Sequence, residues 1–367
     1  MKILYVTTIG LTSIFFKKLI LELIEEGHTV DFACNEDDYP VDDELKRSNC
    51  KIFQVDFSRS PISKGNIQSV KALRKIAEDN HYDIIHCHTP VAGVCTRLAC
   101  RTLRKKGLKV FYTAHGFHFY KGAPLINWLI YYPVEKLMSR FTDVLITINH
   151  EDYDRACKKM KARRIELIPG VGIDYDRFAF AKVDRSAKRR EIGVPDNALL
   201  LISVGELNQN KNHRVVISAL ALLNDPQIHY VIVGKGILHE YLNSFAAESG
   251  VAEQVHLAGY REDVHELFKA ADINVFPSVR EGFGLAAIEG LAAGLPLICS
   301  DNRGTREYAV DGVNAAVCIP PTPEEYKSAI LRLTEHPLEN VSQSVARFSY
   351  QNTCEMVKAF YNRECGA

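Results

Sequence analysis

A glycine-containing loop separates an apolar run at residues 273–276 from a helical pattern at residues 285–293. Gly282 and Gly284 let its backbone approach a ligand closely, because glycine has no Cβ. The N–H groups and dipole at the start of the helix favour an anion such as a diphosphate. Glu281 and Glu289 flank this position, and two carboxylates there suit hydrogen bonds from sugar hydroxyls. The segment therefore predicts a site for a phosphorylated sugar.

Other residues have types that bind metals. Residues 86–88 read His-Cys-His, but successive residues of a strand point to opposite faces, so the three side chains do not converge on one ion. Asp-x-Asp pairs occur at residues 152–154 and 174–176, and neither follows a suitable strand. Residues 234–236, Gly-Lys-Gly, are too short for a dinucleotide fingerprint. We predict no metal and no cofactor.

Charge and composition exclude some partners and leave others open. Of the 367 residues, 45 are Lys or Arg and 45 are Asp or Glu, so the overall balance gives no support to a nucleic-acid partner. Residues 1–180 hold 27 of these basic residues against 22 acidic ones, which leaves 18 against 23 in the remainder. A basic surface on the first half could attract anionic lipid, although solvated helix faces explain the same excess.

The ten cysteines lie mostly in apolar stretches and form no Cys-x-x-Cys pair, as expected in a reducing compartment. The first residues read as a strand, and no apolar run reaches the roughly 18 residues of a membrane helix. We therefore expect a cytoplasmic protein, with at most peripheral contact to the inner face of the plasma membrane. The aromatic stretch 124–138 is either a packed helix with a proline kink or a surface for acceptor or membrane.

Strands and helices alternate along the chain, which predicts α/β domains with parallel sheets covered on both faces. The first series ends near residue 172, and a charged, irregular stretch up to residue 197 suits a linker. A second series then begins. Two doubly wound, Rossmann-like domains would bind ligands beyond the carboxyl ends of their strands, in a central cleft. The strands expected from the apolar runs are 3–7, 28–34, 83–86, 110–113, 144–148, 199–204, 229–233, 255–257, 273–276 and 296–299.

Motifs along nearly the whole chain resemble retaining glycosyltransferases of family 4, which have the two-domain GT-B fold. Residues 281–289 are similar to the family's E-x7-E element, and residues 113–115 to its T-x-H segment. Residues 170–178 resemble its interdomain G-[VI]-D-x-x-x-F, and residues 304–307 its G-x-x-E turn. Two further segments, 117–128 and 205–212, resemble a bacterial exopolysaccharide and capsule subgroup.

The resemblance implies the two domains and a role for each site residue. The N-terminal, acceptor-side domain would span residues 1–172 and include a last helix at about 350–367, and the donor-binding domain would span 173–349. Glu289 would bind the ribose, Glu281 the donor sugar, and Lys211 the diphosphate. His115 would contact the donor sugar near the bond that breaks. The expected donor-binding set is completed by Phe283, Gly284, Leu285, Gly205, Arg303 and, as a weaker candidate, His118.

The chain departs from the family pattern in two places. Glu206 follows Gly205 where the family usually has arginine, so one phosphate-binding cation is absent, and Arg280 or Arg303 could replace it. The first loop, residues 8–12, lacks the usual double glycine.

The resemblance implies a hexosyltransferase that uses a nucleoside diphosphate sugar, with UDP favoured, and retains the anomeric configuration. We expect the reaction to be metal-independent, because the sequence has no plausible metal cluster and Lys211 is cationic. The acceptor would be a saccharide, and in exopolysaccharide or capsule biosynthesis this saccharide would be linked to polyprenyl diphosphate. Two alternatives stay open. A GT-B-like epimerase or hydrolase would act on the donor alone, and a non-catalytic partner subunit would bind nucleotide without consuming donor.

Overall fold

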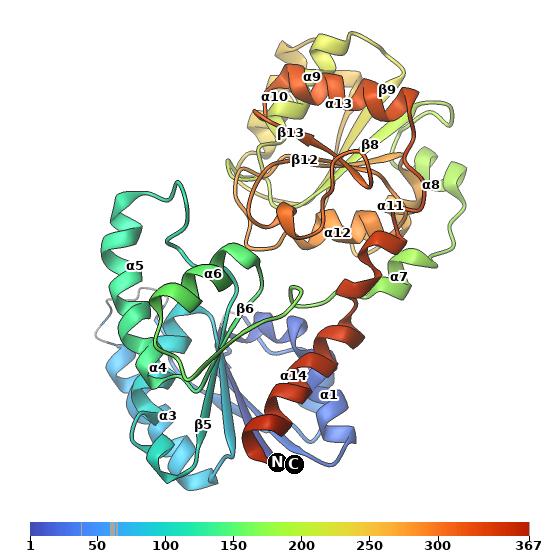
Figure 1. The fold of residues 1–367 in the computed structure, drawn as a ribbon. Helices are drawn as coiled ribbons and strands as arrows, with labels where there is room; N and C mark the ends of the chain where they lie inside the picture. Colours follow the sequence, from blue (N-terminus) through green and yellow to red (C-terminus); the bar gives the residue numbers. More distant parts are fainter. Residues whose placement is uncertain (38, 59–62, 64, 367) are drawn as a thin grey trace. The chain divides into compact units, whose positions relative to one another are not determined.

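The computed structural model describes residues 1–366 except 38, 59–62 and 64, and it divides the chain into two compact units. Unit 1 contains Met1–Val171 and Gln351–Ala367, and unit 2 contains Gly172–Tyr350 (Figure 1). Each unit has one parallel sheet with helices on both faces, so the expected doubly wound architecture is confirmed. The acceptor and donor roles of the two units stay predictions.

Unit 1 is built on a seven-stranded sheet in the order β3-β2-β1-β4-β5-β6-β7. The side chains of β4 are all buried, as expected for a strand covered on both faces. The strands are β1 (Lys2–Ile9), β2 (Thr29–Asn35), β3 (Ile52–Gln54), β4 (Ile84–His88), β5 (Lys109–Ala114), β6 (Val144–Thr147) and β7 (Arg164–Leu167). The helices are α1 (Lys17–Glu25), α2 (Asp43–Arg47), α3 (Asn66–Asn80), α4 (Pro90–Cys100), α5 (Leu125–Met138), α6 (His150–Lys159) and α14 (Tyr350–Cys365).

Unit 2 has a six-stranded sheet in the order β10-β9-β8-β11-β12-β13. Helix α13 begins with a Thr322 cap and Pro323 in the first turn, a common N-terminal arrangement. The strands are β8 (Leu199–Val204), β9 (Ile228–Val233), β10 (Val255–Gly259), β11 (Ile273–Phe276), β12 (Leu297–Ser300) and β13 (Ala315–Cys318). The helices are α7 (Tyr175–Ala179), α8 (Arg185–Glu191), α9 (His213–Leu223), α10 (His239–Glu248), α11 (Val264–Ala270), α12 (Leu285–Ala292) and α13 (Pro323–Glu335).

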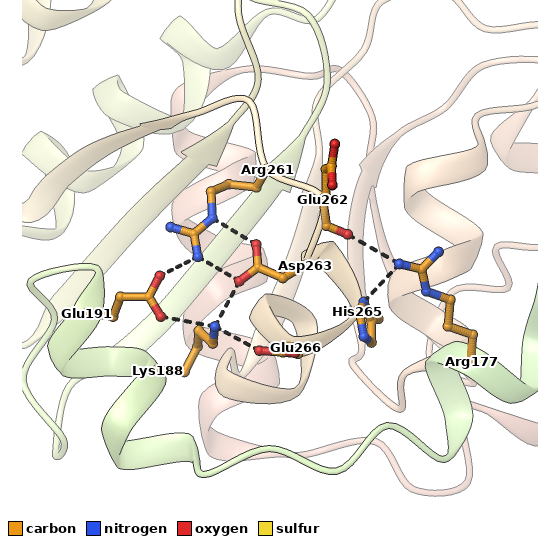
Figure 2. Close-up of polar contacts among 8 residues, drawn as sticks. All are labelled: Arg177, Lys188, Glu191, Arg261, Glu262, Asp263, His265 and Glu266. Carbon is orange, nitrogen blue, oxygen red and sulfur yellow. Dashed lines mark hydrogen bonds and ion pairs between the residues drawn. The ribbon is translucent and has the colours of Figure 1, made fainter. Parts of the chain in front are cut away.

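The prediction of an irregular linker up to residue 197 is wrong, because this stretch forms α7 and α8. The charges that suggested a linker make ion pairs with the β10–α11 region (Figure 2). Lys188 lies 2.8 Å from Asp263 and 2.7 Å from Glu266, and Arg261 bonds both Glu191 and Asp263. These partners raise the pKa of Lys188 and lower that of Asp263. The charged residues therefore attach the segment to unit 2.

Helix α5 packs one side against the core, as expected of a packed helix, and its role as a surface for acceptor or membrane stays a prediction. Trp128, Tyr131 and Tyr132 pack against the core of unit 1, and Pro133 lies inside the helix. The opposite side exposes a row of large apolar side chains: Leu125, Ile126, Leu129, Ile130, Val134 and Leu137. Among the described residues, no helix has both the length and the apolar character needed to cross a bilayer.

Candidate functional site

The loop before α12 has a backbone that only glycine fits well. Gly284 caps the helix with a φ of 90°, and a Cβ there would lie 2.8 Å from the Tyr308 hydroxyl and 2.9 Å from the Phe276 ring. The first hydrogen bond of the turn runs from the Ala287 amide to the Gly284 carbonyl, at 3.2 Å. The preceding amides therefore lack intrahelical partners, as at any helix N-terminus, and can receive an anion.

The turn after β12 holds this loop in place. The Tyr308 hydroxyl lies 2.9 Å from the Phe283 carbonyl oxygen and 3.0 Å from that of Gly284. A Cβ on Gly304 would meet the Phe283 oxygen at 2.7 Å and Cβ of Glu281 at 2.9 Å, so the turn packs tightly on the loop. Tyr308 was missed from the sequence, because a tyrosine one residue beyond the G-x-x-E turn carries no distinctive signal.

Lys211, Glu281 and Arg303 come together at this loop. Lys211 Nζ lies 2.7 Å from Glu281 Oε1 and 4.9 Å from the centre of the Phe276 ring. Arg303 is buried and its Nε donates to the Glu281 carbonyl oxygen at 3.2 Å. Two cations beside the amides of a helix N-terminus form a suitable environment for a diphosphate.

Gly205 and Glu206 begin the loop that carries Lys211. The Gly205 amide donates to the Val233 carbonyl at 2.9 Å, which joins this loop to the end of β9. Glu206 is exposed, and its carboxylate accepts from the Asn208 side chain at 3.0 Å. Glu206 is therefore no phosphate ligand, while Arg303 occupies a place beside Glu281 where it could supply the second cation.

Glu289 lies in the middle of α12, one turn beyond Leu285. Its carboxylate makes no hydrogen bond or ion pair within the part of the chain that the structure describes. Burial raises its pKa to about 7, and the Arg177 guanidinium opposes that shift. Arg177 itself bonds the Glu262 carbonyl and His265 (Figure 2). Glu289 is half-buried, and a carboxylate without a protein donor that is still partly accessible is suited to accept hydrogen bonds from the hydroxyl groups of a ligand.

His115 follows β5 in unit 1 and is partly exposed. Its Nε2 lies 3.1 Å from Nδ1 of His88, and burial lowers the pKa of His115 to about 4. His118 is exposed and stacks on Tyr131 of α5, with ring centres 4.5 Å apart. The structure thus associates His118 with α5 and His115 with the end of β4.

The His-Cys-His run provides no cluster of metal ligands. His86 uses both ring nitrogens, at 2.5 Å from the Tyr361 hydroxyl and 2.7 Å from that of Thr113. Across the described residues, no group of three or more His, Cys, Asp or Glu side chains is placed to hold a metal ion.

The candidate residues thus form a main group in unit 2 and a smaller group in unit 1. In unit 2, the start of α12 provides the amides of Phe283, Gly284 and Leu285. The side chains of Lys211, Glu281 and Arg303 lie beside them, and Glu289 follows one turn farther along α12. This group can bind a diphosphate, stabilise negative charge on a leaving phosphate and accept hydroxyl hydrogen bonds.

Comparison with known proteins agrees with this chemistry. Residues 2–149 match the family model "Glycosyl transferase 4-like", and residues 184–352 match "Glycosyl transferases group 1". The solved structure of Anabaena HepE in complex with UDP and glucose has a TM-score of 0.80 and 19% identity, and covers 99% of this chain and 100% of its own. That likeness supports the GT-B fold.

Two relatives are similar in sequence. The candidate glycosyltransferase EpsD of Bacillus subtilis (strain 168) is 43% identical over 266 residues, which cover 71% of this chain and 70% of that protein. An Escherichia coli UDP-Gal:α-D-GlcNAc-diphosphoundecaprenol α-1,3-galactosyltransferase is 26% identical over 344 residues, covering 92% and 88%. The chain therefore belongs to the glycosyltransferases, with a family 4-like N-terminal domain and a group 1 C-terminal domain.

Proposed function

We propose that the chain transfers a hexosyl group from a nucleoside diphosphate sugar to a lipid-linked saccharide in exopolysaccharide or capsule biosynthesis. The observation that carries this proposal is the start of α12. Amides and two cations there suit a diphosphate, and farther along the helix the unpartnered Glu289 carboxylate suits ribose hydroxyls. The exopolysaccharide or capsule setting rests on the resemblance of residues 117–128 and 205–212, and a lipid-linked acceptor is supported by the name of the E. coli relative.

UDP is the favoured nucleotide. The E. coli relative is named for a UDP-galactose donor, and HepE was solved with UDP. In the proposed complex Glu289 accepts from the ribose, Glu281 from the donor sugar, and Lys211 and Arg303 face the diphosphate. We further propose transfer with retention and without a metal ion.

The chemical role of the protein is to stabilise the leaving group. Breaking the bond between the sugar and the phosphate leaves negative charge on the diphosphate, which Lys211, Arg303 and the loop amides would stabilise. Our assignment gives no carboxylate of the described residues the role of nucleophile, so we propose a front-face reaction, in which the leaving phosphate oxygen takes the acceptor proton. His115 would contact the donor sugar near this bond.

The first test is a thermal-shift screen of nucleoside diphosphates and their sugars, followed by incubation of the protein with the best donor. UDP or a UDP-sugar should raise the melting temperature most. With donor alone, the proposal predicts no epimerised sugar and little hydrolysis. Rapid conversion of donor without an acceptor would instead indicate an epimerase or hydrolase. Binding without turnover under every acceptor condition would indicate a non-catalytic subunit.

Peripheral contact with an anionic membrane is the second part of the proposal, and α5 supports it. Leu125 and Leu129 are 80% and 73% exposed, and Lys121, Lys136 and Arg140 are exposed near the ends of the same helix. The one carboxylate within α5 belongs to Glu135, which is buried and paired with Arg97. An apolar row flanked by basic side chains is the pattern of a helix that lies in the headgroup region.

Sedimentation with lipid vesicles tests this contact. Binding should be stronger to anionic than to neutral vesicles and should fall with salt, because surface charges are screened over about 8 Å at physiological ionic strength. Leu129→Ser should weaken binding severalfold, because it removes apolar area from the proposed contact. Ile237→Ser is the matched control, since Ile237 is 89% exposed but lies in unit 2. Equal loss in both variants, or no vesicle binding, would contradict the assignment of α5.

A further inference from the structure

Three histidines cluster at the carboxyl ends of β4 and β5. His88 is buried, with its ring centre 3.9 Å from that of Phe16 and 4.2 Å from that of His86. Its Nδ1 lies 3.1 Å from Nε2 of His115. His88 thus packs directly behind the residue that is proposed to contact the donor sugar.

His86 and His88 differ in how their nitrogens are satisfied. Both nitrogens of His86 have protein partners, the hydroxyls of Tyr361 and Thr113, as expected of a histidine that serves the core. Nε2 of His88 is buried and has no partner among the described residues. Within the described part of the chain, the one side-chain hydrogen bond of His88 is therefore the one to His115. Core packing accounts for His86 but leaves His88 unexplained.

The protonation of the pair follows from this geometry. Burial lowers the pKa of His115 to about 4 and that of His88 well below its usual value, so both rings are neutral near pH 7 and each carries one N–H. If His115 donated to His88, the proton of His88 would lie on its buried Nε2, with no acceptor. If His88 instead donates to His115, its buried Nε2 carries only a lone pair. A buried N–H without an acceptor is rarer in proteins than a buried acceptor without a donor, so we favour this second arrangement.

We propose that His88 is a positioning residue for His115, donating from Nδ1 to Nε2 and thereby fixing the proton of His115 on its own Nδ1. Nδ1 of His115 makes no hydrogen bond in the described part of the chain. The consequence for catalysis rests on the proposed function: His115 would present an N–H group to an oxygen of the donor sugar. Without His88 the ring could turn or take the other tautomer, and an acceptor would face the sugar oxygen.

Nuclear magnetic resonance of the full-length, ligand-free protein with ¹⁵N-labelled histidine rings tests the assignment directly. The signals of His115 are identified by their loss in His115→Gln. The wild-type spectrum should show a protonated Nδ1 and an unprotonated Nε2 for His115. His88→Phe keeps the ring packing but removes the donor, so the Nε2-protonated tautomer should appear. His88→Asn, whose amide nitrogen replaces Nδ1, should restore the wild-type pattern. A wild-type His115 protonated on Nε2, or a tautomer unchanged in His88→Phe, would overturn the proposal.

Kinetics separate this inference from the proposed function. His88→Phe should lower kcat about tenfold or more with little change in KM for the donor, and His88→Asn should recover most of the loss. The matched control is His229→Phe, which breaks a similar histidine pair in unit 2, where His229 Nδ1 lies 2.9 Å from His256 Nε2. This control should leave kcat unchanged. A shifted tautomer with unchanged kcat would uphold the positioning of His115 and contradict its proposed contact with the sugar.

Discussion

At the scale of single residues, Glu289 carries the most specific expectation. Its carboxylate has no protein donor among the described residues, and ribose hydroxyls would supply one. Glu289→Ala should weaken the binding of UDP by about ten- to hundredfold, because a hydrogen bond to a charged group contributes about 1.5–3 kcal/mol. Isothermal titration calorimetry on the folded variant measures this. Unchanged affinity for UDP would refute the ribose contact.

The raised pKa of Glu289 adds a dependence on pH. Burial raises it from 4.5 to about 7, and the ionised form is the stronger hydrogen-bond acceptor, so affinity for UDP should rise between about pH 6 and pH 8. Glu289→Gln should flatten that rise. The stability of the folded protein should change in the opposite direction from the affinity for UDP, and fall as pH rises. Between pH 4.5 and about 7, the folded state holds a proton on Glu289 that the unfolded state has released. The stabilisation is full below pH 4.5 and is lost as pH rises through about 7. A pH profile for UDP binding that stays the same in Glu289→Gln would exclude Glu289 as its source.

The ion pair between Lys211 and Glu281 predicts unequal effects of its two members. Glu281→Gln releases Lys211 from a partner at 2.7 Å, so binding of UDP should hold or improve while turnover with a UDP-sugar falls. Lys211→Met should weaken the binding of UDP itself, because a cation beside the diphosphate is lost. Parallel measurements of affinity and initial rate distinguish the two variants. Equal loss of UDP affinity in both would mean that the pair acts as one structural unit.

At the scale of elements, a buried ion pair ties α5 to α4. Arg97 is fully buried, lies 2.8 Å from Glu135 and stacks over the Tyr112 ring at 4.0 Å. Arg97→Met should destabilise the protein by about 3–5 kcal/mol, because Glu135 would remain buried without its partner. The double variant with Glu135→Leu should recover much of this loss. Denaturant unfolding measures both, and a single variant as stable as the wild type would contradict the coupling.

The sequence predicted the strands with large apolar side chains well, and it predicted the strands with polar or small residues poorly. β8, β9 and β11 have almost entirely apolar runs, and their positions were predicted to within a residue. β7 was missed because Arg164 and Glu166 interrupt its apolar residues, and β13 because its small residues resemble a loop. α7 and α8 were taken for a linker, since the partners of their charges lie about 70 to 90 residues away in sequence.

The candidate site likewise has features that the sequence predicted and features that it did not. The loop before α12 was predicted as a unit because its glycines and carboxylates are adjacent in sequence. Two details depend on contacts between distant segments and leave no local signal. The ion pair of Lys211 joins residues that are 70 positions apart, and the pairing of His88 with His115 spans 27. His88 was considered only as a metal ligand, because its partner follows the next strand.

At the scale of the whole molecule, activity should not depend on a metal ion. The proposed reaction relies on Lys211 and Arg303 to stabilise the leaving diphosphate, a role that a divalent cation serves in other enzymes. Turnover should therefore survive an excess of chelator, with Lys211→Met as the variant that loses activity regardless of metal. Loss of turnover on chelation, with rescue by magnesium or manganese, would contradict this account.

The central claim is the transfer of a hexose from a UDP-sugar to a lipid-linked saccharide. The most direct measurement incubates the full-length protein with a panel of UDP-hexoses and a polyprenyl-diphosphate-linked saccharide, and follows the lipid product by mass spectrometry. The account predicts a gain of one hexose on the lipid with at least one donor, abolished or strongly reduced in Glu289→Ala. Donor consumed without any glycosylated lipid, or equal product from the wild type and Glu289→Ala, would contradict it.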